Sequence, residues 1–590
     1  MLEYADYLIP EHLPRYTTVY GMLTAVCRKY AGKTAFQMKD SDDNYRKTTY
    51  GTIWEKSEGV ARFLLGLGVV PGDRVALMSE NSPEWGIAYF SIIMTRAVLV
   101  PVDATLSFPD VRFIIEHSGS GILFTSRAIY EKMWKDNLSA VPGLKKLILI
   151  DGPDQPDGGP VSLAQCAKAG SSAVLPVDFS PGDLLEILYT SGTTGNPKAV
   201  MLTHGNVASN LNGIHRMIHF DESDVFLSVL PLHHVFECTV GFLAALSAGC
   251  TITYAESLKS SSLIANMQET RVTILLGVPL LFEKLYYGII RAIDKKSLHI
   301  RAFCHGMLAV VRAARILLGI ELGRGVFAGL RKKAGLDTLR LTVSGGGPLP
   351  WIVARGFIDL GITIVQGYGL SETSPVLTVS TLAHNNIHAA GLPLPDAKIR
   401  IIEPDAQGTG EIAVRGPMVM SGYYRNPEAT SEVVRDGWFM TGDSGYIDHR
   451  GFVHITGRLK NVIVTHGGKN VHPEELEEKL DASPFIKESM VYGEAISEEI
   501  KGEEVKAIIV PDYALARENW ESLRHAHSHH EPTDEAVEAE VTRAVQHLNA
   551  HLPTYKKITG YRIEKEELVK TTTRKIKRYL YTPQSGPRPS

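Results

Sequence analysis

At 590 residues the chain is too long to fold around one ordinary hydrophobic core, so two or more domains are expected. Its hydrophobic content of 44%, charged content of 21% and net charge of −4 are typical of a soluble globular protein and give no electrostatic footprint for nucleic acid. Its five cysteines form no Cys-x-x-Cys pair, which argues against a zinc module or a disulfide framework and suits a reducing cytoplasm.

The first residues, MLEYADYLIPEHLPRY, lack the basic start and apolar core of a signal peptide. No uninterrupted apolar run reaches the roughly 20 residues of a membrane-spanning helix. We therefore expect a cytoplasmic protein, and we leave open a peripheral contact with the inner face of the membrane.

Residues 48–130 alternate helical and strand-like patterns. The expected helices cover residues 54–67, 84–94 and 111–116, and the expected strands cover 74–78, 98–102 and 121–125. Alternation at this spacing predicts a parallel sheet covered by helices, and so an α/β fold. Residues 151–182, rich in Gly, Pro, Asp and Ser, are expected to form a surface connection.

The stretch YTSGTTGNPK at residues 189–198 lies between two apolar runs that read as buried strands, 184–188 and 199–202. Glycines let backbone N–H groups approach an anion closely, and Lys198 adds a positive charge, so the stretch predicts a phosphate cradle. The glycines are Gly192 and Gly195, and hydroxyl groups come from Thr190, Ser191, Thr193 and Thr194. The spacing does not fit a Walker A loop. A polar hairpin turn is the alternative that this stretch alone leaves open.

The string PLHHVFE at residues 231–237 lies between a strand-like run, 225–230, and a helical one, 238–246. A metal site is disfavoured, because adjacent histidine side chains diverge and no Glu-x-x-His partner is present. A buried histidine with a satisfied hydrogen bond is the simpler interpretation.

Apolar and basic residues alternate along residues 299–333. The apolar positions Met307, Val310, Val311, Ala314, Ile316, Leu317 and Ile320 track a helical face, and Arg312, Arg315, Arg324, Arg331 and Lys332 lie around it. Two interpretations stay open: a buried helix with a solvated basic edge, and a basic amphipathic element at a lipid surface.

Two strand-like runs further on, 339–343 and 362–365, each end in glycines. The first runs into Gly345, Gly346 and Gly347, where a flat ring could lie against bare backbone; a tight turn is the alternative. The second runs into Gln366, Gly367, Tyr368, Gly369, Leu370, Ser371, Glu372 and Thr373. Here Tyr368 offers an aromatic face, Ser371 a hydroxyl and Glu372 the hard oxygens that Mg²⁺ prefers.

The remaining motifs lie towards the C-terminus. Residues 408–424 are expected to form a β-hairpin, and Asp443 offers a carboxylate that can accept both ribose hydroxyls, unless it is a cap or turn aspartate. The string GRLKN at 457–461 and the basic stretch KTTTRKIKR at 570–578 could each be solvated surface. The histidines at 525, 527, 529 and 530 are interpreted as a solvated loop rather than a metal site.

These strings, in this order, resemble the motifs of the adenylate-forming superfamily, which includes acyl-CoA synthetases, luciferases and peptide-synthetase adenylation domains. YTSGTTGNPKAV resembles its phosphate loop, and the resemblance covers nearly the whole chain. It implies a large N-terminal α/β domain with helix-covered sheets (residues 1–457), a hinge (458–461) and a smaller, mobile α+β C-terminal domain (462–590).

The resemblance also implies the roles of residues. Asp443 matches the ribose ligand, Arg458 a ribose or phosphate contact, and Lys460 the hinge pivot. His234, and more weakly Phe236, match positions that line the acyl pocket. The matched nucleotide-binding set is Thr190, Ser191, Gly192, Thr193, Thr194, Gly195, Lys198, Gly345, Gly346, Gly347, Gln366, Gly367, Tyr368, Gly369, Ser371, Asp443 and Arg458. Thr190 and Glu372 would hold Mg²⁺, and Lys575 would bridge the carboxylate and the α-phosphate.

The resemblance implies an acid–thiol ligase that uses ATP, Mg²⁺ and coenzyme A. Residues 299–333 and the string VIVTHGGKNVHP at 462–473 are similar to long-chain fatty acyl-CoA synthetases, so a long-chain fatty acid is the expected substrate. A medium-chain or aryl acid, a carrier-protein thiol as acceptor, and a non-catalytic nucleotide-binding protein stay open as alternatives. A homodimer is likewise left open, because the sequence does not reveal the oligomeric state.

Overall fold

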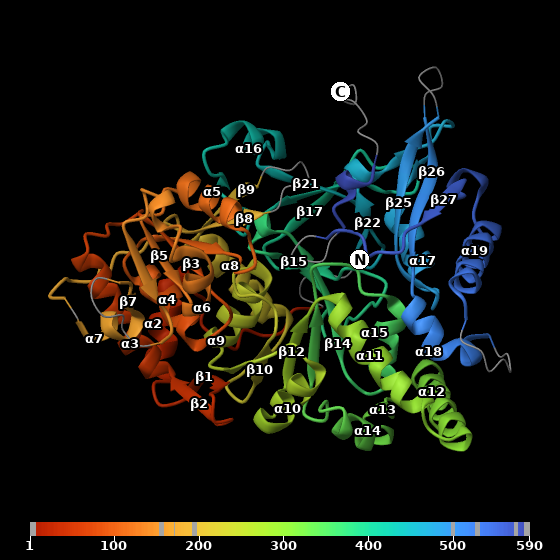
Figure 1. The fold of residues 1–590 in the computed structure, drawn as a ribbon, viewed down its shortest axis with the longest axis horizontal. Helices are drawn as coiled ribbons and strands as arrows, with labels where there is room; N and C mark the ends of the chain where they lie inside the picture. The colour runs from red at the N-terminus through yellow and green to blue at the C-terminus, as the bar shows by residue number, and fades with distance from the viewer. Residues whose placement is uncertain are drawn as a thin grey trace.

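The structure of the chain is a computed structural model that describes residues 7–152, 159–169, 171–190, 197–496, 502–524, 532–570 and 576–582. Figure 1 shows the N-terminal part, in red to yellow, on one side and the C-terminal part, in blue, on the other. The chain is α/β, with a large N-terminal part that holds three sheets and a smaller C-terminal part, as the sequence predicted.

The first sheet has the strand order β19-β9-β8-β4-β3-β5-β6-β7. Its strands are β3 (Arg74–Met78), β4 (Val98–Val102), β5 (Ile122–Thr125), β6 (Lys146–Leu149), β7 (Val161–Ser162), β8 (Leu184–Thr190), β9 (Lys198–Thr203) and β19 (Gly422–Tyr423). β4 to β7 run parallel to one another, as the alternating pattern predicted, and β9 returns antiparallel to β8. The expected surface connection 151–182 instead contributes edge strand β7 and helix α7 (Leu163–Ala169).

The second sheet has the order β16-β15-β14-β13-β12-β10-β11-β1-β2. Its strands are β1 (Thr34–Lys39), β2 (Tyr45–Thr49), β10 (Val225–Ser228), β11 (Thr251–Tyr254), β12 (Ile274–Gly277), β13 (Leu341–Ser344), β14 (Ile364–Gly369), β15 (Val376–Val379) and β16 (Leu392–Pro393). The strands from β1 to β14 along this order pair in parallel, and β2, β15 and β16 are antiparallel additions at the edges.

Helices cover both sheets, and one of them is buried along nearly its whole length. Only Glu84 of α4 (Pro83–Met94) is not buried, which explains why its sequence is apolar all round rather than on one face. The helix begins where Ser82 accepts a hydrogen bond from the backbone N–H of Trp85 at 3.1 Å. The other helices of this part include α2 (Val19–Lys29), α3 (Tyr50–Gly66), α5 (Phe108–Ser118), α8 (His204–Met217), α10 (Ser260–Thr270), α11 (Pro279–Asp294) and α15 (Trp351–Asp359).

The expected hairpin within residues 408–424 is wrong. β18 (Gly410–Arg415) pairs with β17 (Lys398–Ile402) and β21 (Trp438–Ile447) in a third sheet, which also contains β20 (Val434–Arg435) and β22 (Val453–Arg458). Residues 422–423 form β19, which instead pairs with β9 of the first sheet. The segment therefore joins two sheets, because each of its strands finds its partner far away in the sequence.

The C-terminal part contains a sheet of β25 (Ile486–Ala495), β26 (Glu503–Pro511) and β27 (Gly560–Ile563), with its own apolar core. The pair β23 (Ile463–Val464) and β24 (Asn470–Val471) precedes it. The helices here are α17 (Pro473–Asp481), α18 (Tyr513–Arg524) and α19 (Asp534–Ala550). α17 and α19 pack on the same face of the sheet, because both contribute side chains to this one core.

Residues 298–333 form three helices, α12 (Leu298–Leu318), α13 (Gly323–Val326) and α14 (Ala328–Lys333). They lie at the lower right edge of the molecule in Figure 1. Among the helices of the described ranges, none combines the length and the apolar character needed to cross a membrane.

Candidate active site

The motif residues gather where parallel strands of the first two sheets end. β8 ends at Thr190, β13 at Ser344 and β14 at Gly369, so the loops that follow them open at the carboxyl ends of the strands. Open α/β sheets place their ligands at this edge. Motifs that are far apart in the sequence therefore lie close together in the fold.

Thr190 and Lys198 flank the predicted phosphate loop. They are cross-strand partners in the β8–β9 pair, and the Thr190 hydroxyl donates to the carbonyl of Lys198 at 3.3 Å. This hairpin holds the two ends of the loop together. Five of the predicted loop residues, Ser191, Gly192, Thr193, Thr194 and Gly195, lie outside the described residues.

The side chain of Glu372 lies close to that of Lys198, linked by a tyrosine. Glu372 belongs to the single turn Ser371–Thr373, and its Oε1 accepts a hydrogen bond from the Tyr423 hydroxyl at 2.9 Å. Lys198 Nζ lies 4.7 Å from the centroid of the same tyrosine ring. Burial and the Glu372 charge raise the pKa of Tyr423, so the phenol stays a hydrogen-bond donor.

Sequence reasoning missed Tyr423. It lies in the segment wrongly expected to be a hairpin, and only the pairing of β19 with β9 brings it beside Lys198. Its position in the string 408–424, in a motif otherwise recognised, was the one available signal.

Asp443 is held from two sides. Tyr368 donates a hydrogen bond to Asp443 Oδ2 at 2.6 Å, and Arg458 Nε lies 2.8 Å from Asp443 Oδ1. Asp443 and Arg458 are cross-strand partners of β21 and β22. Burial, with the Asp443 charge next, raises the pKa of Tyr368. These three residues, predicted from three separate motifs, are therefore brought together.

Lys460 lies in the turn Leu459–Asn461, directly after β22. Burial, followed by the positive charges of Arg458 and Lys198, lowers the pKa of Lys460 to about 8. Three cations from two segments, Lys198 from one and Arg458 and Lys460 from the other, thus converge on the same region, with Glu372 and Asp443 beside them. Such a group of cations, held close at an energetic cost, is suited to a polyphosphate.

The glycine segments give close backbone contacts. A Cβ on Gly345 would lie 2.8 Å from the ring of Phe236, so the ring packs directly on the glycine backbone. A Cβ on Gly369 would lie 1.8 Å from the carbonyl oxygen of Pro375, which no side chain could tolerate. Gly346 and Gly347 meet only ordinary contacts with Val278 and Pro279.

Gln366 and Gly367 lie on β14 between these segments. Gln366 Nε2 donates to the Ile387 carbonyl at 2.9 Å, and its Oε1 accepts from the Leu349 N–H at 3.3 Å. The amide is therefore engaged with protein backbone on both sides. The side chain of Gln366 thus joins β14 to Leu349, just beyond the glycine segment, and to Ile387.

The loop that carries His234 is tied to the first sheet. Asn81, just after β3, donates to Ser228 Oγ at 3.0 Å and to the Leu230 carbonyl at 2.6 Å, and accepts from the Leu232 N–H at 2.9 Å. Asp103, just after β4, lies 3.5 Å from His233 Nε2. Asn81 and Asp103 thus connect the loop to the ends of β3 and β4.

Behind this loop lies a buried carboxyl group. The Ser228 hydroxyl donates to Glu237 Oε1 at 2.7 Å. Burial raises the pKa of Glu237 to about 8, against the smaller opposite effect of the Ser228 hydrogen bond, so the group is largely protonated at neutral pH. Glu237 opens a π-helix, Glu237–Ala244, where the sequence predicted an ordinary helix.

The metal alternatives for the histidines have no support in the described ranges, where no group of three or more His, Cys, Asp or Glu side chains is arranged to hold a metal ion. His234 is half-buried, and its ring lies 5.1 Å from that of His233. The His-rich stretch 525–530 and Lys575 lie outside the described residues.

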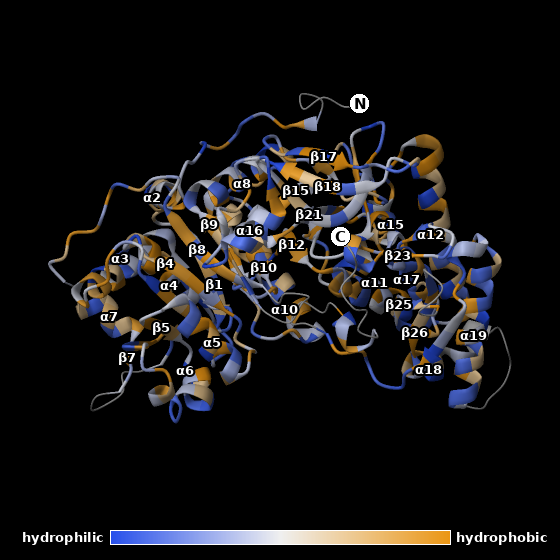
Figure 2. Cartoon of the chain, turned by 90° about the horizontal axis from the view of Figure 1, so that it is seen from above, coloured by the Kyte–Doolittle hydropathy of each residue, from blue (hydrophilic) through white to orange (hydrophobic). Residues whose placement is uncertain are grey.

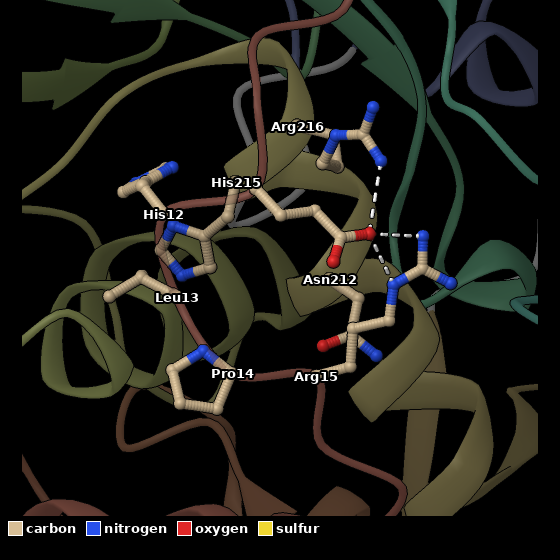
Figure 3. Close-up of a pocket in the computed structure, with 8 residues that line it drawn as sticks. His12, Leu13, Pro14, Arg15, Asn212, His215 and Arg216 are labelled. Carbon is tan, nitrogen blue, oxygen red and sulfur yellow. Dashed lines mark hydrogen bonds and ion pairs between the residues drawn. The ribbon is translucent and has the colours of Figure 1, made fainter.

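A shallow recess of a different kind lies where the N-terminal segment packs on α8 (Figure 3). Glu11 lies between Arg15 and Arg216, with Oε1 3.1 Å from Arg216 Nη1. The backbone of Tyr16 exchanges hydrogen bonds with the Asn212 side chain at 2.8 and 3.0 Å. None of the predicted site residues lines this recess, and the contacts around it hold the N-terminal segment in place.

Comparisons with known proteins show which family the chain belongs to. A family model described as AMP-binding enzyme matches residues 23–424. The long-chain-fatty-acid–CoA ligase FadD15 of Mycobacterium bovis is 35% identical over 456 residues, covering 73% of each chain. A feruloyl-CoA synthase of Amycolatopsis is 30% identical over 471 residues, covering 78% of this chain and 83% of the relative. The crystal structure of ATP-bound MatB from Rhodopseudomonas palustris is similar with a TM-score of 0.74 at 26% identity, over 95% of this chain and 98% of that chain. The chain belongs to the family of AMP-binding enzymes.

Proposed function

We propose that this enzyme is an acid–thiol ligase that activates a long-chain fatty acid with ATP and transfers the acyl group to coenzyme A. The observation that carries the proposal is the convergence of Lys198, Arg458 and Lys460 beside Glu372 and Asp443. The choice of acid rests on the relatives that bear long-chain ligase names and on the segment 299–333.

In the first half-reaction the acid's carboxylate oxygen attacks the α-phosphorus of ATP, giving acyl-AMP and releasing pyrophosphate. Asp443 accepts the ribose hydroxyls, with Arg458 fixing the carboxylate. Tyr368 and Gly345–Gly347 contact the adenine, with Gln366, Gly367 and Gly369 shaping the same segment. Catalysis of this kind is mainly positioning and charge neutralisation.

The residues around the phosphates have distinct roles. Lys198 and the phosphate loop neutralise the leaving pyrophosphate, and Ser371 contacts the α-phosphate. The oxygens of Glu372 and Thr190 suit Mg²⁺, and the carboxylate is kept in place by the Tyr423 hydroxyl. When bound there, the metal ion adds positive charge beside the phosphates. Lys575 is assigned to the developing charge between carboxylate and α-phosphate.

In the second half-reaction the coenzyme A thiolate attacks the acyl carbonyl and AMP leaves. We assign the hinge to residues 458–461 and the mobile domain to residues 462–590, pivoting at Lys460 so that Lys575 is withdrawn. His234 and Phe236 line the acyl pocket in this assignment. The packing of Phe236 on Gly345 supports it, because the acyl carbonyl must meet the α-phosphate beside the nucleotide segment.

The test is pyrophosphate release from Mg-ATP with acetate, octanoate, palmitate or benzoate, each with and without coenzyme A. The proposal expects release that peaks on palmitate and consumes coenzyme A. If release peaks on octanoate or benzoate, a medium-chain or aryl acid replaces the long-chain acid as the proposed substrate. The feruloyl-CoA synthase relative makes an aryl acid the second candidate. Release without consumption of coenzyme A would point to a carrier-protein thiol, and absence of release with every acid would point to a binding protein.

We further propose that the enzyme works in the cytoplasm in peripheral contact with the inner face of the membrane through residues 299–333. The support is the exposed apolar surface of that segment. A long-chain acid partitions into lipid, so such a contact would place the enzyme at its substrate.

A further inference from the structure

Helix α12 presents an apolar face to solvent. Its exposed positions include His299 and His305, and His305 Nε2 lies 2.8 Å from Asp294 Oδ1. Its other exposed positions include uncharged residues that recur at helical spacing, namely Ala302, Phe303, Gly306, Ala309, Val310, Ala313, Ile316 and Leu317, with Ile320 just beyond the helix. We call these nine residues the α12 stripe. Figure 2 shows α12 at the edge of the molecule, coloured as hydrophobic over much of its length. Phe303 is 67% exposed and Leu317 is 78% exposed, which is unusual for a surface in contact with water alone.

Two arginines of the same helix, Arg312 and Arg315, point the other way. Arg312 Nε and Arg315 Nη2 lie 2.8 and 2.9 Å from the two carboxylate oxygens of Asp359, whose side chain is fully buried at the end of α15. Turning the helix to hide the stripe would leave this carboxylate buried without its cations, which is strongly unfavourable. The ion pairs therefore fix the rotation of α12 and keep the stripe outward.

This geometry corrects the amphipathic pattern expected from the sequence. Arg312 and Arg315 lie on the inner side of the apolar helix rather than on a solvated edge, and Arg331 of α14 is buried too. The exposed basic residues instead lie on the segments that flank the helix, Lys295 and Lys296 before it, and Arg324, Lys332 and Lys333 on α13 and α14 after it. Glu321 and Asp337 are exposed acids of the same stretch.

We propose that the α12 stripe is the surface that inserts into an anionic lipid leaflet, with the five flanking cations on the phosphate headgroups. This inference rests on the peripheral membrane contact proposed above and names the side chains that make it. An apolar stripe bordered by cations is the arrangement that binds an anionic interface. A second copy of the chain packed symmetrically on the stripe would bring the same cations together, so charge favours lipid over self-association.

The experiment is co-sedimentation of the full chain with vesicles of phosphatidylcholine and phosphatidylglycerol, and with vesicles of phosphatidylcholine alone. The stripe variant is Phe303→Ser with Leu317→Ser. Its matched control is Val174→Ser with Leu258→Ser, two residues that are 86% and 71% exposed elsewhere. Lys332→Glu with Lys333→Glu tests the cations.

We expect the wild type and the matched control to bind the anionic vesicles. The stripe variant should bind about a hundredfold more weakly, because each large apolar side chain withdrawn from lipid costs about a factor of ten. The lysine variant should bind more weakly as well, and added salt should weaken the wild type. Equal binding of the stripe variant and the wild type, or absence of binding by the wild type, would overturn the inference.

Two further measurements separate this inference from its alternatives. If light scattering shows that the wild type is a dimer and the stripe variant a monomer, and both bind vesicles equally, the stripe is a self-association surface and the inference is wrong. Pyrophosphate release with octanoate, a soluble acid, should be the same in the wild type and the stripe variant. If the stripe variant no longer binds vesicles but keeps this activity, the result supports the α12 stripe as the lipid-binding surface. If neither protein releases pyrophosphate with any acid, the result contradicts the proposed ligase activity but not the proposed lipid-binding surface.

Discussion

At the scale of single residues, the environment of Lys460 is the most informative feature of the site. Its pKa of about 8 is depressed by burial and by the charges of Arg458 and Lys198. A bound triphosphate would reverse these electrostatic effects and favour the protonated lysine. ATP affinity should therefore fall as the pH rises above about 8, because more of the free enzyme must then take up a proton to bind.

The prediction is that ATP binding at pH 8.5 takes up about three quarters of a proton, the fraction of Lys460 that is neutral in the free enzyme. Calorimetry in buffers of different ionisation enthalpy measures this uptake. Lys460→Gln should abolish most of it. Equal uptake by the variant and the wild type would mean that another group titrates.

A second residue-scale prediction concerns Glu237. Its folded pKa, about 8, lies above the unfolded value near 4.5, so the unfolded chain binds fewer protons between these values. Stability contributed by this group therefore falls as the pH rises from about 4.5 to 8. Glu237→Gln keeps a hydrogen-bond acceptor for Ser228 and does not ionise.

The free energy of unfolding of Glu237→Gln, relative to wild type, should rise by up to about 4 kcal/mol between pH 5 and pH 8. Denaturation of both proteins at the two pH values measures it. Glu237→Leu serves as the control that removes the Ser228 hydrogen bond and should be less stable than Glu237→Gln at pH 5. A constant difference between Glu237→Gln and wild type would show that Glu237 does not titrate in this range.

The residues of the candidate site could be named from the sequence because each motif is local. The string around Tyr368 and Glu372, the aspartate at 443 and the arginine at 458 were recognisable within a few positions. Their contacts with one another were not, and Tyr423 was missed. These contacts depend on a side-chain hydrogen bond from β14 to β21 and on the pairing of β21 with β22, and the place of Tyr423 depends on the pairing of β9 with β19. The roles of all these site residues, His234, Lys460 and Lys575 included, remain predictions.

At the scale of elements, the buried strands could be predicted from the sequence, but the elements that they and the helices pack against could not. The runs 74–78 and 98–102 were placed correctly as β3 and β4, because a parallel strand buried on both faces is apolar throughout. The rotation of α12 could not be predicted, since Asp359, the residue that fixes it, lies 44 and 47 positions from the two arginines.

The element-scale prediction is that Asp359→Asn destabilises α12. Breaking a buried ion pair costs about 3 kcal/mol or more, because the remaining charges lose their partner. Thermal denaturation should show a lower Tm, and limited trypsin digestion should cut the chain sooner at Arg312 and Arg315. Glu321→Gln, an exposed carboxylate nearby, is the matched control. Digestion of the Asp359 variant at the wild-type rate would contradict the role of the ion pairs.

At the scale of the whole molecule, the proposed function requires the C-terminal part to move about residues 458–461. Gly457 precedes this segment with a φ of +151°, and a Cβ there would lie 2.3 Å from the Glu474 carboxylate of α17. Asn461 donates to the same carboxylate at 2.8 Å. The segment is thus held on both sides by the first helix of the C-terminal part, which couples its backbone to that part.

Two variants test the proposed movement. Lys575→Ala should abolish acyl-AMP formation and largely spare thioester formation from supplied acyl-AMP, because the lysine acts only in the first step. Single-turnover assays of each half-reaction measure this. Equal loss of both halves would contradict the assignment.

Lys460→Pro restricts the backbone where the proposed pivot lies. Adenylation should be more intact than thioester formation in this variant, because only the second step follows the movement. The same two assays apply, and Lys460→Ala is the control that removes the charge without fixing the backbone. Unchanged thioester formation in Lys460→Pro would place the pivot elsewhere.

The packing of Phe236 on Gly345 has a thermodynamic consequence. The ring belongs to the loop that carries His234, and the glycine belongs to the segment assigned to adenine, so one side chain would form a common wall between the two proposed binding sites. A ligand that fixes this wall for one site fixes it for the other. Such coupling is reciprocal by necessity: whatever factor ATP contributes to the affinity for the acid, the acid contributes to the affinity for ATP.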